Sequence, residues 1–241
     1  MELSQLDEKT RKIIERFVEQ LKPALADNLK SVILYGSRVS GGHSSRHSDI
    51  NLLLVLAKAD ITGLKSIAHI KPKFKFNKIA PLVLSKEHLE NSTDTFPMEF
   101  LDMQDNYILL WGEDCLKDLK IDLANLRHQC EWELKSKLIQ LQQFYIHSRG
   151  NPAALSNFLI QGLPSFMLVF KNILRLKGII EDNKDKILAK ISGEFNLSPD
   201  IFNQLWQARL GNFKLTNPEE TFARFLSNLQ EFSQKVDGLK I

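Results

Sequence analysis

Cysteine is scarce in this chain, which has only Cys115 and Cys130 among its 241 residues. Two cysteines are too few for a disulfide scaffold, and their separation does not match the spacing of a metal-binding motif. Free thiols suit a reducing compartment. The sequence therefore excludes a disulfide-rich secreted fold and a cysteine-ligated zinc module.

Long apolar runs and strong charge of one sign are also missing. Stretches such as Phe166 to Phe170 are far shorter than the roughly 20 apolar residues that cross a bilayer, and no apolar signal-peptide segment follows Met1 to Ser4. The net charge of +3 is too mild to argue for nucleic acid. With 43% hydrophobic and 25% charged residues, the composition is ordinary for a soluble globular protein. We therefore expect a cytoplasmic protein with no membrane partner.

One stretch, from Ser31 to Leu56, organises the first half of the chain. An apolar run over Val32 to Tyr35 predicts a buried strand, and a second run over Leu52 to Leu56 predicts another. Between them lie a Gly-Ser break and a polar segment rich in Gly, Ser, His and Arg. Asp49 and Asn51 stand two residues apart, so their side chains should share one face of the second strand. This predicts a polar shelf, where backbone N–H groups and a hydroxyl hold phosphate opposite a carboxylate that holds a divalent cation.

The pattern of strand, Gly-Ser, loop and acid within a second strand resembles the nucleotidyltransferase superfamily related to DNA polymerase β. Gly36, Ser37 and Asp49 match that pattern. The resemblance implies a nucleoside triphosphate substrate, Mg²⁺, and transfer of a nucleotidyl group to a hydroxyl or phosphate. The nucleotide-binding candidates are Gly36, Ser37, Arg38 and Ser48, and the catalytic candidates are Asp49 and Asn51.

This sequence departs from the family pattern where acids are expected. Asn51 stands where the second metal-binding Asp belongs, and Ser40 stands where many members carry an Arg. The strand expected over Lys78 to Ser85 offers Ala80 and Pro81 where a third acid would be sought. We expect a strand over 96–100 as well, whose acid, Glu99, either replaces the missing metal ligand or lies on a solvated sheet face.

The missing acids limit the chemistry that the family would imply. Two-metal transfer needs carboxylates that hold a pair of cations roughly 4 Å apart, and Asn51 brings no charge. The sequence predicts at most one Mg²⁺, bound together with the nucleotide, and supplies no general base. Three hypotheses follow: a nucleotide-binding protein with a weakened or lost catalytic centre, an active transferase that modifies a small molecule or a protein, and a non-catalytic interaction scaffold.

The loop between the two strands carries four basic or imidazole groups, at Arg38, His43, Arg46 and His47. They could neutralise triphosphate oxygens, since small shifts decide the charge of histidine near neutral pH. They could equally be exposed residues of a solvated loop, and the sequence leaves both interpretations open.

Two further segments of the first half carry structural expectations. The apolar stripe of Leu6 to Leu29 predicts a helix that Pro23 ends or kinks. The alternation of Lys and Phe over Lys73 to Asn77 predicts an edge strand with its lysines facing water.

Beyond Leu116 to Asp122 the strand signal disappears and helical periodicity takes over. We expect an α+β protein with a nucleotidyltransferase domain over 1–118 and a helical bundle over 119–241, similar to the kanamycin nucleotidyltransferase type. In that type the bundle supplies the acceptor pocket and sometimes a base, for which Glu131 or Glu133 are candidates against ordinary surface charge. The acceptor or protein partner is not readable from the sequence. A homo-oligomer is possible through an apolar stripe, although periodicity does not show which stripe stays uncovered.

Overall fold

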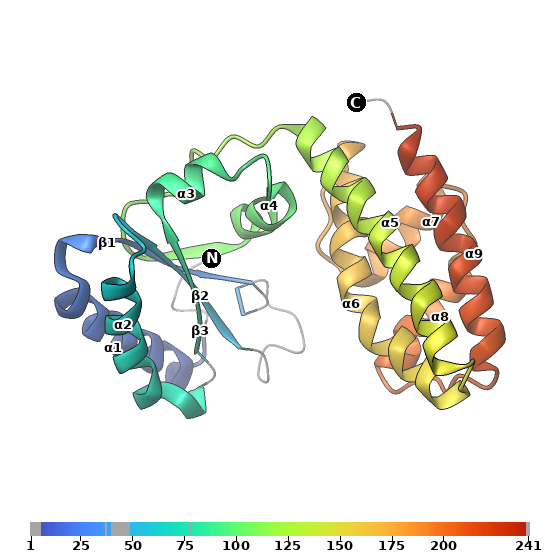
Figure 1. The fold of residues 1–241 in the computed structure, drawn as a ribbon, viewed down its shortest axis with the longest axis horizontal. Helices are drawn as coiled ribbons and strands as arrows, with labels where there is room; N and C mark the ends of the chain where they lie inside the picture. Colours follow the sequence, from blue (N-terminus) through green and yellow to red (C-terminus); the bar gives the residue numbers. More distant parts are fainter. Residues whose placement is uncertain (1–5, 37, 40–48, 78, 240–241) are drawn as a thin grey trace. The chain divides into compact units, whose positions relative to one another are not determined.

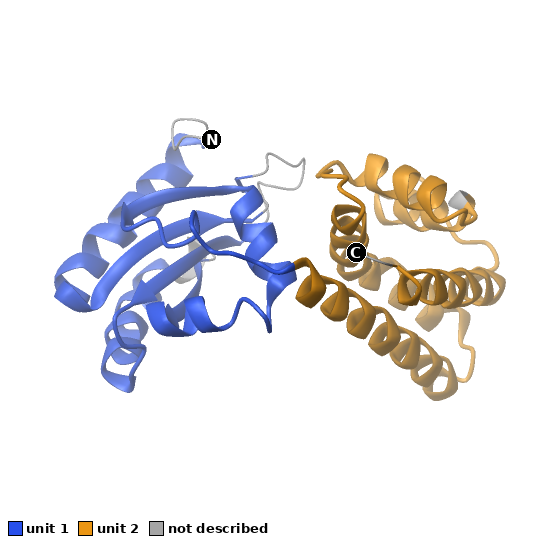
Figure 2. Ribbon diagram, turned by 90° about the horizontal axis from the view of Figure 1, so that it is seen from above, with its two compact units in different colours: residues 1–122 blue, residues 123–241 orange. Residues whose placement is uncertain are grey.

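The computed structural model describes residues 6–36, 38–39, 49–77 and 79–239, with a few side chains in this part left undescribed. The chain divides into two compact units, residues 1–122 and 123–241 (Figure 2). Each unit has its own hydrophobic core and is described here by itself.

A four-stranded sheet with the order β3-β2-β1-β4 forms the centre of the first unit (Figure 1). β1 pairs antiparallel with both β2 and β4, and β3 runs parallel to β2. The strands are β1 (Leu29–Tyr35), β2 (Ile50–Leu56), β3 (Ile79–Ser85) and β4 (Tyr107–Gly112). The two strands expected around the Gly-Ser break are therefore confirmed as neighbours, and the expected third strand lies beside the second.

Helices cover both faces of this sheet. Leu52 and Leu54 of β2 belong to the core that includes Phe17 of α1 (Glu8–Leu25) and Ile67 of α2 (Ile61–Ile70). The alternate residues Leu53 and Val55 pack into a second core on the other face, beside α3 (Lys86–Asn91) and α4 (Pro97–Asp105). Because consecutive side chains of β2 point to opposite cores, the strand is apolar and buried at every position except Asn51.

The start of α1 is set by Asp7, whose carboxylate accepts a hydrogen bond from the backbone N–H of Thr10. The buried residues that follow form one stripe at helical spacing: Ile14, Phe17, Val18, Leu21 and Leu25. Pro23 lies in the last turn, and the helix continues two residues past it before a short 3₁₀ turn over Ala26–Asn28.

Two expected strands are wrong. Lys73 to Asn77 belong to a 3₁₀ segment, Lys71–Asn77, in which Phe74 is buried with its ring edge-on to Phe17, the centroids 5.2 Å apart. Burial of the Phe74 ring in the core favours this 3₁₀ conformation over the strand that the Lys-Phe alternation predicts. The edge strands are β3 and β4 instead, and β3 carries Pro81, which an edge position tolerates.

The segment 96–100 starts the helix α4, with Pro97 in its first turn. Proline suits that position because the first N–H groups of a helix have no partner within it. The fourth strand is β4, which the expectation over 96–100 missed. β4 ends at Gly112, whose φ is +84° and where an added Cβ would lie 2.1 Å from the carbonyl oxygen of Lys30.

The second unit contains five helices within its described residues: α5 (Leu123–Ser148), α6 (Pro152–Leu176), α7 (Lys184–Glu194), α8 (Pro199–Arg209) and α9 (Pro218–Asp237). α6 is the central helix and contacts the other four. Asn151, Asn183 and Asn217 cap the starts of α6, α7 and α9 through their side-chain oxygens.

Phenylalanine rings fill the core of the helical unit. Phe170 of α6 packs edge-on against Phe202 and Phe232, with centroids 5.3 and 5.4 Å away, and Phe225 contacts both Phe166 and Phe202. α6 is long and apolar enough to cross a membrane by length and composition alone. Its contacts with four other helices account for that composition, because a helix at the centre of a bundle is apolar nearly all round.

Candidate functional site

The end of β1 and the start of β2 meet at Gly36. Its φ is +82°, and an added Cβ would lie 2.9 Å from Nδ2 of Asn51. Glycine is favoured here because L side chains avoid this φ, and a larger residue would also have to displace the amide of Asn51. The backbone turns at once, as the N–H of Val39 donates to the carbonyl of Gly36 over 2.9 Å. The structure thus brings Gly36 and Asn51 together.

Strand register places Asn51 in a row of residues across the sheet. Asn51 lies opposite Tyr35 of β1 and Ala80 of β3, and Tyr35 lies opposite Tyr107 of β4. Tyr35 and Tyr107 pack against the core on the α3 and α4 side, so the row lies on that face. Asp49 is exposed and directly precedes β2, two residues before Asn51. Alternation favours the same face for its carboxylate.

The position beside Asn51 on β3 carries no acid, since Ala80 and then Pro81 stand there. Glu99, the acid considered as a replacement, lies on α4 and not on a strand of the sheet. Its neighbour Phe100 belongs to the core on the same face as the row. Among the residues that the structure describes, no three His, Cys, Asp or Glu side chains gather so that they could hold a metal ion.

Arg38 is directed toward the start of α1. Its Nη1 donates to the hydroxyl of Thr10 over 3.2 Å. Hydrogen bonds from Thr10, and to a smaller degree the charge of Arg38, lower the pKa of Asp7 at the helix cap. Arg38 therefore links the turn after Gly36 to the start of α1, and its positive charge lies near the carboxylate of Asp7.

Ser37 and Ser48, together with His43, Arg46 and His47, lie outside the described residues. The expectations for them stay predictions.

Two tyrosines, which were not among the residues predicted from the sequence, border the candidate site. Burial raises the pKa of Tyr35, so its hydroxyl stays neutral. The hydroxyl of Tyr107 lies within 3.0 and 2.8 Å of the two carboxylate oxygens of Asp114. Burial, followed by this hydrogen bond, raises the pKa of Tyr107 to about 12. The sequence could have predicted the place of Tyr35, since this residue directly precedes Gly36.

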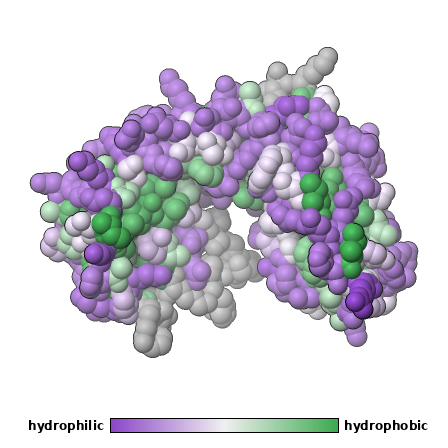
Figure 3. All heavy atoms as spheres, in the orientation of Figure 1, coloured by the Kyte–Doolittle hydropathy of each residue, from purple (hydrophilic) through white to green (hydrophobic). Residues whose placement is uncertain are grey.

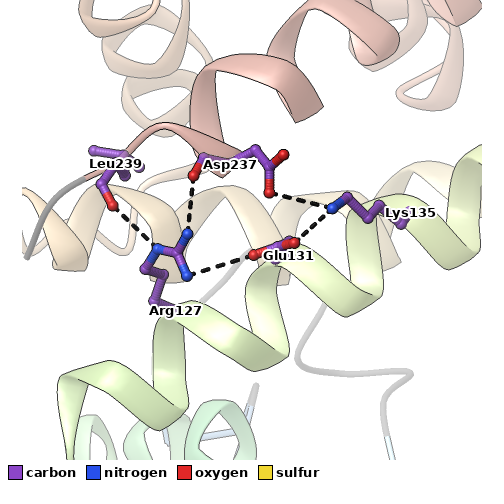
Figure 4. A network of polar contacts seen from close by, with 5 residues as sticks. All are labelled: Arg127, Glu131, Lys135, Asp237 and Leu239. Carbon is purple, nitrogen blue, oxygen red and sulfur yellow. Dashed lines mark hydrogen bonds and ion pairs between the residues drawn. The ribbon is translucent and has the colours of Figure 1, made fainter.

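The glutamates considered as bases on α5 are engaged in ion pairs. Glu131 lies 3.5 Å from Arg127 and also contacts Lys135 (Figure 4). Glu133 lies 3.1 Å from Lys137. These contacts favour the interpretation of both residues as ordinary helix charge.

In chemical terms, the corner offers one exposed carboxylate, one amide and the backbone of a glycine turn, beside a neutral tyrosine. Such a set can bind an anion and a single hard cation. The described residues do not assemble the ring of acids that a pair of cations requires.

Comparisons with known proteins bear on the fold. No family model and no curated protein matches the sequence. Among solved structures, the chain is similar to the spectinomycin adenyltransferase AAD(9) from Enterococcus faecialis, crystallised with ATP and spectinomycin. The match covers 91% of this chain and 98% of that chain, at a TM-score of 0.57 and 14% sequence identity. The chain therefore shares the fold of this adenyltransferase, a small mixed sheet with helices followed by a helical unit, which is the α+β fold expected from its Gly-Ser and Asp pattern.

Proposed function

We propose that this protein binds a nucleoside triphosphate at the corner formed by Gly36, Asp49 and Asn51, and that its catalytic centre is weakened or lost. One observation carries the proposal: Asn51 lies against Gly36, with the uncharged Ala80 opposite it on β3. The solved relative was crystallised with ATP, which supports a nucleotide as the ligand.

A single Mg²⁺ fits the donors that are present. The carboxylate of Asp49 and the side-chain carbonyl of Asn51 are hard oxygen ligands, and the phosphate oxygens of the nucleotide would complete the coordination. A bound Mg²⁺ would neutralise phosphate charge. Glu99 stays a candidate third ligand by our proposal, from its place on α4.

The phosphates would contact the glycine turn and the residues that flank the loop. In this proposal the backbone at Gly36, the hydroxyls of Ser37 and Ser48 and the charge of Arg38 hold phosphate oxygens. The protein would act in the cytoplasm, where free thiols such as Cys115 and Cys130 persist.

Calorimetry with ATP and GTP, with and without Mg²⁺, tests the proposal. We expect Mg²⁺ to strengthen nucleotide binding. In Asp49→Ala we expect the strengthening by Mg²⁺ to be about tenfold smaller than in the wild type. Asp27→Ala is the matched control, because Asp27 is an exposed aspartate of the same unit, placed on the 3₁₀ turn after α1. If no nucleotide produced either binding heat or a thermal shift, the interaction scaffold would be the surviving hypothesis.

Restoring the missing charge tests the proposed cation site. We expect Asn51→Asp to strengthen divalent-ion binding in the presence of nucleotide by about tenfold, because a carboxylate binds Mg²⁺ better than an amide. Asn51→Ala, which has no oxygen ligand, should weaken it. Titration with Mn²⁺ followed by paramagnetic relaxation measures both variants. An unchanged affinity in Asn51→Asp would show that this side chain does not face the cation.

The second candidate is an active nucleotidyltransferase that uses Asp49, Asn51 and Glu99 with Mg²⁺. It is favoured by the solved relative, which was crystallised with ATP and with spectinomycin. Release of pyrophosphate in the presence of a panel of small-molecule and protein acceptors separates it from the first proposal. Release that depends on both an acceptor and Asp49 would support the active enzyme.

A further inference from the structure

Helix α5 carries an apolar ridge on its exposed side. The ridge consists of Trp132, Ile139 and Ile146, whose exposed fractions are 61%, 54% and 73%. The three residues are seven positions apart, so they lie along one side of the helix. Figure 3 shows apolar atoms along the line of α5 on the outer face of the helical unit.

The ridge is not the side of α5 that packs into its own unit. Leu126, Leu134 and Leu141 are the buried residues of that inner side. The segment from Leu138 to Ile146 contains no charged residue. Depletion of charge around exposed aromatic and aliphatic side chains is characteristic of the core of a protein interface.

An apolar groove adjoins one end of the ridge. It lies between α5 and α9, has a volume of about 360 Å³, and includes Ile146 in its lining beside Tyr145 and Phe222. The rings of Tyr145 and Phe222 are 5.4 Å apart, and the hydroxyl of Tyr145 donates to Glu219 over 2.6 Å. The groove therefore has an aromatic wall held by a hydrogen bond at its rim.

We propose that a second copy of this chain docks on the ridge, with the two α5 helices antiparallel and Ile139 at the twofold axis. In that arrangement the residue seven positions before Ile139 meets the residue seven positions after it. Trp132 of each copy then reaches Ile146 and the adjoining groove of the other, and the contact forms twice. A surface that carries both a bulky knob and its groove, equidistant from a central residue, is self-complementary in the sense that a twofold interface requires.

Charges near the ridge are compatible with self-association. Lys135 is paired with Glu131 and Asp237, and Glu133 is paired with Lys137, within each copy. The uncharged segment from Leu138 to Ile146 lies nearest the axis and its groove. Antiparallel pairing therefore brings no like charges face to face at the centre, where they would be costly. A parallel pair would set Trp132 against Trp132 and leave both grooves unfilled.

Oligomeric state in solution tests the proposal, independently of any nucleotide. We expect a dimer by light scattering and sedimentation, and Ile139→Glu should raise its dissociation constant roughly a hundredfold by placing two carboxylates on the axis. Ile180→Glu is the matched control, because Ile180 is 70% exposed in the same unit but lies outside α5. A wild-type monomer at about 100 μM, or an unaffected dimer in Ile139→Glu, would overturn the proposal. Circular dichroism checks that each variant stays helical.

Cysteine crosslinking tests the direction of the helices. Ile139→Cys should form an intermolecular disulfide with itself under mild oxidation, because residues at a twofold axis meet their own copies. Trp132→Cys and Ile146→Cys should crosslink only when the two variants are mixed. The wild-type chain is the control for its natural thiols, of which Cys130 is fully buried. Crosslinking of Trp132→Cys with itself would overturn the antiparallel arrangement.

Discussion

Gly36 and Asn51 show how a single close contact defines the candidate site. The glycine adopts a φ of +82° and leaves room for the amide of Asn51, so the turn and the second strand depend on each other. In the proposed nucleotide site, an aspartate at position 51 would bring negative charge next to phosphate and would need a cation. Asparagine offers a neutral oxygen and two N–H donors, which agrees with the proposal that the site binds a nucleotide with a single cation.

We predict that Gly36→Ala destabilises the protein by about 1–3 kcal/mol, because alanine adopts this φ with strain and its Cβ displaces the amide end of Asn51. Gly178→Ala is the matched control, since Gly178 has a φ of +74° but no atom within 4 Å of its added Cβ. It should cost only about 1 kcal/mol. Urea denaturation of both variants measures the difference. Equal losses would show that the contact with Asn51 contributes nothing.

At the scale of elements, the end of α9 is held by the start of α5. Arg127 donates from Nε to the carbonyl of Leu239 over 3.1 Å and from Nη2 to the carbonyl of Asp237 over 2.9 Å (Figure 4). The last carbonyls of a helix have no partner within it, so a basic side chain that reaches them secures the helix end. Lys135 joins the same network through the carboxylates of Glu131 and Asp237, and not through a backbone carbonyl of the described residues.

Arg127→Ala should therefore release the end of α9 and lower the free energy of unfolding by about 1–2 kcal/mol. Amide hydrogen exchange should accelerate over the last turn of α9. Lys135→Ala should change stability by less than about 0.5 kcal/mol, because it removes only exposed ion pairs. Equal changes in stability and in amide exchange for the two variants would show that the hydrogen bonds of Arg127 to the backbone do not hold this helix end.

β4 is joined to the turn that follows it by the contact of Tyr107 with Asp114. Burial, and then the hydrogen bond to Asp114, raises the pKa of Tyr107 from 10.0 to about 12. A pKa raised on folding means that the native state retains the proton more strongly than the unfolded state. The resulting stability is fully present below pH 10 and is lost as the pH rises toward 12.

We expect wild type to lose about 1 kcal/mol more than Tyr107→Phe between pH 10 and 12, a value reduced for the partial exposure of this tyrosine. Denaturation of both proteins at intervals across that range measures the effect. The comparison cancels the titration of Tyr35 and Tyr145, whose pKa values are also raised. Parallel curves for the two proteins would contradict the assignment.

At the scale of the whole molecule, the chain builds two units that do not share a core. The first unit packs helices on both faces of a sheet, and the second packs α5 to α9 around α6 with phenylalanine contacts. A unit with its own core can in principle fold alone.

We predict that residues 123–241, expressed alone, form a helical domain that unfolds cooperatively. The reason is that the aromatic contacts of Phe170 with Phe202 and Phe232 all lie within this unit. Circular dichroism with thermal denaturation measures it. Phe170→Ala in the same fragment should lower the stability by about 3–5 kcal/mol. A fragment with no cooperative transition would show that the unit needs the first 122 residues.

The sequence by itself determined the elements whose side chains repeat clearly. The buried strands around Gly36 and Asp49 and the apolar stripe of α1 could be predicted, because each is specified by the spacing of apolar residues within one segment. The same local pattern carried the resemblance that predicted the fold, and the comparison with the solved structure confirms that fold.

Only the tertiary structure decided where those patterns compete with distant contacts. Phe74 lies in a 3₁₀ segment and not in the strand that its alternating pattern predicts, because its ring packs on Phe17. Glu99 lies on α4 because Pro97 starts a helix there. The neighbours of Asn51 depend on strand register, and the uncovered stripe of α5 depends on which face α6 and α9 already occupy. Periodicity describes one segment at a time, whereas burial and register are set by partners far away in the sequence.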